Sequence, residues 1–407
     1  MQNILIIEPS TAGLELLPTA HAMGLNVFIL TANQDERIIP TSYQKFIFKS
    51  VIVDTNNFLA MQEATVELHK KYPLSAIIPG FEIFVAHAAR LSCLVGVPGI
   101  SVETGDALRN KAKMRDALLK NDVRSPNHFL LEEKKDIVKI AEQLKFPCVI
   151  KPIDQSGSVH VSKVCNLNEL IYAYDALCRD EWTEMGKGVG KVAIVEEYID
   201  GEEFSIEGYV DQHGANIIAI TKKFLSQEPF FVEMGHIVQA NINEIMRAEI
   251  ESYVKKVIEA LRISLGVFHC EIRVDQQGPI LMEIAGRLAG DRICNLILLS
   301  SGINLYQIML QSYLGQSIYL DDIALKQYAG IRFFALNEQD KYYHIKGITE
   351  LQNMSGFQEF KILVGPGQQV PPLRDFTGRV AFCIFTACSY DILQSLLNNA
   401  QKNIIFE

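Results

Sequence analysis

Short apolar runs alternate with helical patterns over the first hundred residues. Three of these runs predict buried strands: 4–7, 27–30 and 76–80. Residues 10–23 predict a helix that Gly24 ends, and strands separated by helices are typical of βαβ units with a parallel sheet. The turn at 8–13 lacks the GxGxxG spacing of a dinucleotide-binding turn. We therefore expect structural or substrate contacts from this region rather than the nucleotide site.

The pattern changes after Thr104. Residues 106–121 predict a charged helix that ends before Pro126, because the residue before a proline disfavours helix. The amphipathic stretch 244–265 is the most regular helical pattern in the chain. The other elements that we expect are a helix at 168–179 and strands at 146–151, 191–198, 203–210, 215–221, 328–335 and 379–387. The last two strands indicate a smaller α+β domain.

A hairpin with two facing carboxylates is predicted by residues 269–275 and 280–287. If its loop, 276–278, is centred on Gln277, then Glu271 lies directly opposite Glu283. Alternation then divides the hairpin into a polar face of His269, Glu271, Arg273, Glu283 and Arg287, and a core face of Cys270, Ile272, Val274, Ile280, Met282 and Ile284.

Adjacent carboxylates repel one another unless a cation or a shared proton lies between them. Mg²⁺ commonly joins one or two carboxylates to substrate phosphates, and Arg287 could bind a phosphoryl oxygen. The hairpin therefore indicates a magnesium–phosphate site. The alternative is a solvated polar face on which Glu271 pairs with Arg273 or Arg287.

Lysines beside small residues are further candidates for phosphate binding. Lys151 ends an apolar strand and precedes the loop 155–158, whose free N–H groups could hold polyphosphate. Taken alone, Lys151 could equally be a solvated strand end, and Lys111 an ordinary surface lysine of a helix. The glycine-rich segment 186–191 fails the P-loop spacing and precedes a strand, so we interpret it as a loop.

Composition narrows the class of protein. A chain of 407 residues, 48% of them hydrophobic, is expected to form two or three domains. The net charge of −10 argues against a nucleic-acid binder but permits a nucleotide ligand. We expect no membrane span and no signal peptide, since the start has no basic region and no run reaches ~18 apolar residues. The eight cysteines form no CxxC pair, which favours reduced thiols in a cytoplasmic protein over zinc sites or disulfides.

The order of these motifs resembles the ATP-grasp superfamily over most of the chain. The matching segments are Asn110-Lys111, 146–152, 155–158, 195–207 and the Glu271/Glu283 hairpin with Arg287. The resemblance implies an ATP-grasp fold of mixed α/β and α+β class, with a parallel-sheet α/β domain (1–106), a two-lobed ATP-grasp domain (107–318) and a small α+β domain (319–407). Within the superfamily, residues 229–236, 266–271 and 287–291 and the last ~90 residues resemble the L-amino acid ligases that make dipeptides.

The resemblance implies a role for each matching residue. Lys111 and Lys151 would contact the ATP phosphates, as would Lys223, with Lys222 as the alternative. Ser156, Gly157 and Ser158 would form a lid over the phosphates. The adenosine part would be bound by Glu196, Glu197, Tyr198 and Ile199 at adenine and by Glu203 at the ribose. Glu271 and Glu283 would bind Mg²⁺, with Mn²⁺ as an alternative ion, and Arg287 would stabilise the transferring phosphoryl group. Glu233, His236 and Gly290 would line the amino-acid pocket, and Glu233 or His236 would accept the proton of the amine.

The implied activity is an ATP-dependent ligase that activates a carboxylate as an acyl phosphate and couples it to an amine, releasing ADP and phosphate. Small-molecule substrates, most simply two amino acids, are expected, with no nucleic-acid or membrane partner and with a homodimer left open. The superfamily often has Asn two residues after the second metal Glu, and Ala285 stands there instead, which puts a second Mg²⁺ in question. The alternatives are a ligase for another small carboxylate or a non-catalytic nucleotide-binding protein.

Overall fold

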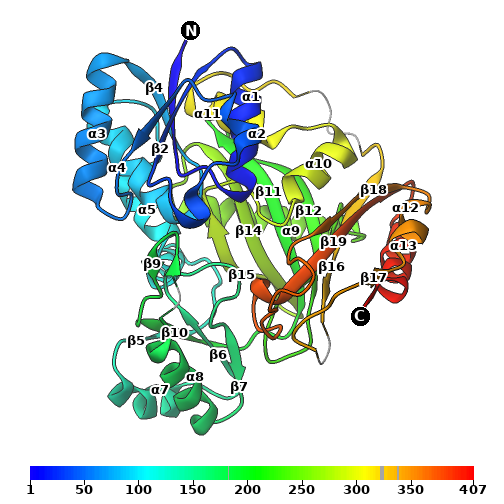
Figure 1. The fold of residues 1–407 in the computed structure, drawn as a ribbon. Coiled ribbons are helices and arrows are strands. Elements are labelled where there is room, and N and C mark those ends of the chain that lie inside the picture. Colours follow the sequence, from blue (N-terminus) through cyan, green and yellow to red (C-terminus); the bar gives the residue numbers. More distant parts are fainter. Residues whose placement is uncertain (182, 321–324, 337–338) are drawn as a thin grey trace.

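The first hundred residues form a parallel sheet with the strand order β3–β2–β1–β4 (Figure 1). Its strands are β1 (Asn3–Ile7), β2 (Asn26–Thr31), β3 (Lys49–Ile52) and β4 (Leu74–Pro79), and its helices are α1 (Leu16–Ala22), α2 (Thr41–Gln44), α3 (Phe58–Lys71) and α4 (Val85–Val95). The side chains from Ile4 to Ile7 are all fully buried, as expected for a parallel strand covered on both faces. The computed structural model describes residues 1–181, 183–320, 325–336 and 339–407.

The turn after β1 is held by close backbone packing. A Cβ atom added to Gly13 would lie 1.9 Å from the carbonyl oxygen of Gly80, which follows β4. Both glycines thus allow the loops at the carboxyl ends of β1 and β4 to touch. This edge of the parallel sheet faces the cavity described below.

The prediction of one continuous helix at 106–121 is wrong, because this segment falls in two helices, α5 (Val102–Leu108) and α6 (Lys111–Lys120). Asn110 begins the second helix by accepting a hydrogen bond from the Lys113 N–H at 3.0 Å. The Lys111 N–H donates to the Ile153 carbonyl at 2.9 Å, which ties the start of α6 to the strand that carries Lys151. This break buries Lys111, which a continuous surface helix would have left exposed.

A small antiparallel lobe follows, with the strand order β5–β10–β6–β7. It comprises β5 (His128–Leu131), β6 (Cys148–Pro152), β7 (Ser162–Val164), β10 (Ala193–Glu197), α7 (Ile137–Gln143), α8 (Leu167–Arg179) and the short pair β8 (Thr183–Glu184) and β9 (Lys187–Gly188). The apolar faces of α7 and α8 pack with the sheet in one core that includes Ile140, Ile150 and Leu170. The small lobe projects from the rest of the molecule in Figure 1.

The large antiparallel sheet has the strand order β15–β14–β11–β12–β13–β16–β19–β18. Its strands are β11 (Glu202–Asp211), β12 (Gly214–Leu225), β13 (Glu233–Val238), β14 (Gly266–Asp275), β15 (Gly278–Ala285), β16 (Tyr328–Ala335), β18 (Phe357–Ile362) and β19 (Arg379–Ala387). The predicted strands 328–335 and 379–387 are confirmed to the residue. They continue the large sheet, since β16 pairs with β13.

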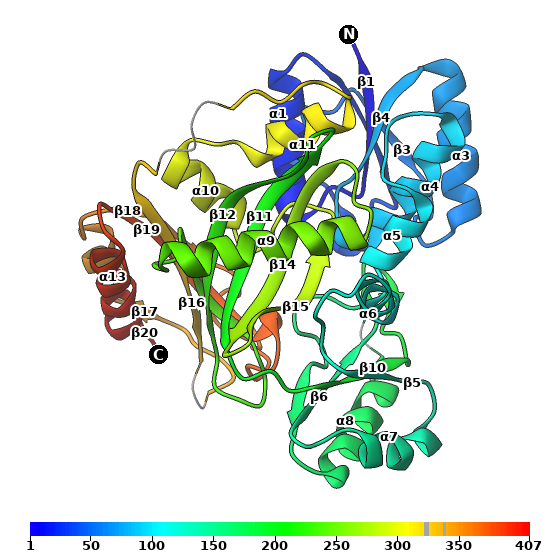
Figure 2. The same cartoon turned by 180° about the vertical axis from the view of Figure 1, so that it is seen from behind.

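Helices cover the large sheet on both sides. They are α9 (Glu244–Ala260), α10 (Ile293–Ser301), α11 (Leu305–Tyr313), α12 (Ile348–Gln352) and α13 (Tyr390–Asn403), and a short pair, β17 (Ile345–Lys346) and β20 (Ile405–Phe406), lies beside the last of them. Figure 2 shows α9 lying across the face formed by β11, β12 and β14. The helix predicted at 244–265 is confirmed but ends at Ala260, where Arg262 takes a positive φ of 53°. Among the helices described, none alone is long and apolar enough to cross a membrane, and only the pair α10–α11, bent by 106°, meets those criteria jointly.

The β14–β15 hairpin pairs Glu271 with Glu283, as predicted, but its turn and register differ from the predicted ones. The turn is two residues long, because Asp275 pairs with Gly278, and this register alone would misalign the carboxylates by one residue. A bulge at Met282 restores the pairing of Glu271 with Glu283. The assignment of Met282 to the core face is therefore wrong, since the bulge turns it toward the cavity.

Candidate active site

A cavity of about 310 Å³ lies where the parallel sheet, the small lobe and the large sheet meet. The predicted site residues that line it are Lys111, Lys151, Ser156, Gly157, Ser158, Glu196, Glu197, Ile199, Glu203, Lys223, Glu233, Glu271, Glu283, Arg287 and Gly290. Of the predicted set, Tyr198 and His236 do not line it. Tyr198 stacks against Phe231 with ring centroids 6.3 Å apart, and His236 is fully buried behind the cavity wall.

The two facing carboxylates each contact a lysine. Glu283 Oε1 lies 3.0 Å from Lys111 Nζ, and Glu271 Oε2 lies 3.0 Å from Lys223 Nζ. His269 Nε2 lies 3.0 Å from Glu271 Oε1, and burial of this carboxylate is outweighed by Lys223 and His269, which hold its pKa well below the ordinary value. Glu271 is therefore ionised, and an ionised oxygen donor next to a second carboxylate suits a hard divalent cation.

Lys223 is the centre of a buried ion cluster. Its Nζ lies 2.6 Å from Glu233 Oε1 and 3.0 Å from both Glu203 Oε1 and Glu271 Oε2. Burial alone would lower the pKa of Lys223, but the three carboxylates hold it well above the ordinary value. The alternative lysine, Lys222, pairs instead with the exposed Glu202 at 3.3 Å. Lys223 is thus the lysine of the two that reaches the cavity.

Lys151 and Glu196 form a second buried cluster with Arg115. Glu196 Oε1 accepts a hydrogen bond from Arg115 Nε at 2.7 Å, and Lys151 Nζ lies 2.6 Å from Glu196 Oε2. Arg115 also donates from Nη2 to the Met282 carbonyl at 2.7 Å, which ties α6 to the bulge of β15. Burial opposes the ionised form of Glu196, but Arg115 and Lys151 together hold its pKa at about 2.

This lowered pKa predicts acid sensitivity of the fold. Because the pKa of Glu196 falls from 4.5 to about 2 on folding, its contribution of about 3 kcal/mol is present above pH 4.5 and is lost as the pH falls toward 2. Glu196→Gln should therefore lower the free energy of unfolding in urea at pH 7 and flatten its decline between pH 4.5 and 3. Glu197→Gln, whose carboxylate contacts Asn127 at the surface, is the control and should retain the wild-type pH profile. An unchanged profile for Glu196→Gln would contradict this role.

The loop at 156–158 reaches over the cavity to the C-terminal part of the chain. A Cβ on Gly157, which has a φ of 66°, would lie 2.6 Å from the Phe376 ring. Ser158 Oγ donates to the Phe231 carbonyl at 3.1 Å. The positive φ and the close approach explain why glycine occupies position 157.

Arg287 contacts a carboxylate that the sequence did not single out. Glu82, almost fully buried, accepts hydrogen bonds from Arg287 Nε at 2.7 Å and from Arg109 Nη1 at 2.6 Å. Burial would raise the pKa of Glu82, but Arg287 and Arg109 hold it at about 2. The position of Glu82 in the sequence could have indicated its role. It follows the carboxyl end of the parallel strand β4, and ligand sites of parallel sheets lie at that end of the strands.

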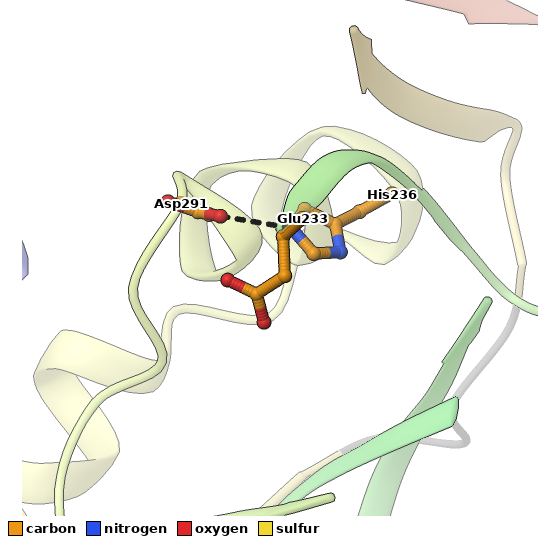
Figure 3. A group of neighbouring side chains, drawn as sticks. All are labelled: Glu233, His236 and Asp291. Carbon is orange, nitrogen blue, oxygen red and sulfur yellow. Dashed lines mark hydrogen bonds and ion pairs between the residues drawn. The ribbon is translucent and has the colours of Figure 1, made fainter. Parts of the chain in front are cut away.

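The far end of the cavity holds a carboxylate–arginine pair. Asp291 accepts two hydrogen bonds from Arg379, at 2.7 and 2.9 Å, and its Oδ2 lies 3.1 Å from His236 Nε2 (Figure 3). Potential ligand atoms of Glu233, His236 and Asp291 lie within 4.8 Å of one another, the spacing of a metal site. Both carboxylates also have cationic partners, Lys223 and Arg379, so ion pairs already hold the group together. Arg379 was missed because it lies 88 residues from Asp291 in sequence.

Two family models match the chain and together span more than half of it. An ATP-grasp domain matches residues 144–295, and L-amino acid ligase C-terminal domain 2 matches residues 332–407. Among curated proteins, an L-arginine-specific L-amino acid ligase from Bacillus subtilis is 24% identical over 82% of this chain and 81% of its own. Dapdiamide A synthase from Enterobacter agglomerans is 24% identical over 70% of this chain and 67% of its own.

The fold agrees with these matches. The crystal structure of an L-amino acid ligase from Bacillus licheniformis superposes with a TM-score of 0.85 at 22% identity, covering 100% of this chain and 98% of that one. The domain order, the facing carboxylates and the two matched models lead to one assignment. The chain contains an ATP-grasp domain followed by the C-terminal domain of the L-amino acid ligases.

Proposed function

We propose that this protein joins the carboxylate of one L-amino acid to the amine of a second, with conversion of ATP to ADP and phosphate. The observation that carries the proposal is the convergence of Lys111, Lys151, Lys223 and Arg287 with the Glu271/Glu283 pair on one cavity. A carboxylate can approach an anionic triphosphate only where cations offset the repulsion. The cavity supplies these cations, although the whole chain carries a net charge of −10.

Glu271 and Glu283 are the residues that we propose to hold Mg²⁺, with Mn²⁺ as the alternative ion. Two carboxylates paired across a hairpin beside phosphate-binding lysines form an oxygen donor set that fits such an ion. The ion would neutralise charge on the transferring phosphoryl group. Ala285 lies in the cavity wall, and its side chain has no oxygen or nitrogen that could bind a metal ion. This supports fewer protein ligands to the ion here than in ATP-grasp proteins that have Asn at this position.

The proposed reaction has two steps. A substrate carboxylate oxygen attacks the γ-phosphorus, the bond to ADP breaks, and an acyl phosphate forms. The second amine then attacks the acyl carbon, phosphate leaves, and the amine loses a proton. Glu233 is the better placed acceptor, because its carboxylate lines the cavity whereas His236 reaches it only through Asp291.

Water must be kept from the acyl phosphate, which hydrolyses readily. The loop carrying Ser156, Gly157 and Ser158 supports this role, since it contacts Phe231 and Phe376 across the cavity. Lys111 and Lys151 would hold the phosphates beneath this loop. The lining residues Glu196, Glu197, Ile199 and Glu203 would bind the adenosine part.

The setting proposed for the reaction is the cytoplasm, where ATP is available. All eight cysteines are unpaired thiols, which suits a reducing compartment. We propose the domain boundaries 1–106, 107–318 and 319–407, small-molecule substrates as the only obligatory partners, and a homodimer as an assembly to be tested.

A phosphate-release screen over all pairs of amino acids tests the proposal. The purified protein with Mg·ATP should release ADP and phosphate in equal amounts for at least one pair, and the product should be a dipeptide. Release of AMP and pyrophosphate would contradict the acyl-phosphate route. Turnover with another small carboxylate, but with no amino-acid pair, would favour the ligase of different substrate class instead.

A further inference from the structure

A second cavity, open and about 1290 Å³ in volume, lies on the face of the large sheet opposite the candidate active site. Strand alternation explains the two faces. Lys223 and His236 pair across β12 and β13 and point toward the active site, whereas their neighbours Phe224 and Gly235 pair on the other face. Arg332 of β16 pairs with Gly235 and extends this second row. The end of α13 and β20 form the opposite wall of the cavity.

Arg332 is buried without an acidic partner. It is 8% exposed, and among the described residues its Nε has no hydrogen-bond partner and its Nη2 hydrogen-bonds with the neutral Asn398 Oδ1 at 3.3 Å. In the part of the chain that the structure describes, no carboxylate forms an ion pair with it. Other buried arginines of the molecule differ, since Arg115, Arg273 and Arg379 each pair with a carboxylate.

The surroundings of Arg332 add positive charge and space. Gly235 lies beside the guanidinium, since a Cβ there would be at ordinary contact distance, 3.5 Å, from Arg332 Nε. The guanidinium also lies over the Phe224 ring at 5.2 Å. Among the described residues that line the cavity, the charged ones are Arg332 and Lys402, both cationic. Burial lowers the pKa of Arg332, yet an arginine keeps its charge in proteins, so the described lining of the cavity carries two positive charges.

We propose that this second cavity binds a small organic anion, a carboxylate or a phosphate, through Arg332 and Lys402. The guanidinium offers planar paired donors that match either oxyanion, and the anion would neutralise a charge that no described carboxylate pairs with. The amide side chains of Gln227, Gln339 and Gln401 line the same cavity and can bind the polar body of such a ligand. The site is separate from the candidate active site and does not depend on the proposed reaction.

Calorimetric titration of the full-length protein tests this proposal with two probes, succinate and inorganic phosphate. At least one should bind the wild-type protein saturably, with succinate identifying a carboxylate site and phosphate a site for phosphorylated ligands. Arg332→Met should weaken binding at least about tenfold, and Lys402→Gln, at the exposed end of α13, about threefold. Arg179→Met, on the exposed face of α8, is the matched control and should bind as the wild type does.

Two further measurements distinguish an anion site at Arg332 from binding at the candidate active site and from a purely structural arginine. Lys151→Met weakens the phosphate site proposed in the candidate active site, so Arg332→Met should still weaken probe binding at least about tenfold in this background, and loss of all probe binding in Lys151→Met alone would overturn the proposal. Arg332→Met should unfold at the same or a higher temperature than the wild type in the absence of anion, because it removes an unpaired charge. A lowered unfolding temperature with unaltered probe binding would instead make Arg332 structural. Absence of saturable binding of both probes up to ~10 mM would also overturn the proposal.

Discussion

Glu271→Gln is expected to lower the rate of ADP formation by ~10²–10³-fold at saturating substrates. Glutamine keeps the size of the side chain and one oxygen acceptor, but it removes the negative charge that faces Glu283 across the hairpin. The charge also pairs with Lys223 and His269, so its loss disturbs the lysine that reaches the phosphate side of the cavity. A coupled assay for ADP, run across a range of Mg²⁺ concentrations, measures the effect.

Glu202→Gln is the matched control for this experiment. It makes the same chemical change on the neighbouring strand β11, where the exposed Glu202 pairs with Lys222 outside the cavity. Its rate should stay within about twofold of the wild type, since surface ion pairs contribute little. Similar losses in both variants, or retention of more than about a tenth of the activity by Glu271→Gln, would remove Glu271 from the proposed metal site.

Lys223→Met is expected to lower the free energy of unfolding by ~3–5 kcal/mol at neutral pH. The substitution keeps a long apolar stem but withdraws the ammonium that contacts three carboxylates. Glu203 keeps Arg273 and Glu271 keeps His269, whereas Glu233 loses the cation nearest to it. A buried carboxylate that has lost its cation destabilises the folded state far more than the intact ion pair did.

The loss caused by Lys223→Met should depend on pH in a defined direction. Burial already raises the pKa of Glu233, and removal of Lys223 raises it further. Because protonation then relieves the buried charge, the variant should recover part of its stability as the pH falls through that raised pKa. Urea unfolding at several pH values measures this recovery. Lys222→Met, one residue away and near the surface, should change stability by less than about 0.5 kcal/mol, and equal effects of the two variants would contradict the central role of Lys223.

Local sequence pattern predicted the elements well where their period was regular. The strands Tyr328–Ala335 and Arg379–Ala387 have the predicted bounds, and the hairpin brings Glu271 opposite Glu283. The hairpin also shows the limit of such reasoning. Its two-residue turn shifts the register by one residue, and the bulge at Met282 shifts it back. A bulge leaves no clear mark in the hydrophobic pattern.

The partners of the candidate site residues were harder to predict, because they come from distant segments. Glu82 reaches Arg287 across 205 residues, and Arg115 reaches Glu196 across 81. Periodicity indicates which face of a strand or helix is polar, but it does not reveal which two polar faces meet. A carboxylate at the end of a parallel strand, such as Glu82, is the exception, since the topology of the sheet directs it to a known edge.

The continuity of the large sheet has a consequence for recombination between related chains. Because β16 pairs with β13, removal of the chain from Tyr328 onward would leave an inner strand with an unpaired edge, which favours aggregation over folding. The C-terminal segment is therefore not a detachable module. A chimaera that exchanges it would have to keep Gly235 in β13, because a Cβ there would lie 2.7 Å from the Ile331 carbonyl oxygen of the exchanged strand β16.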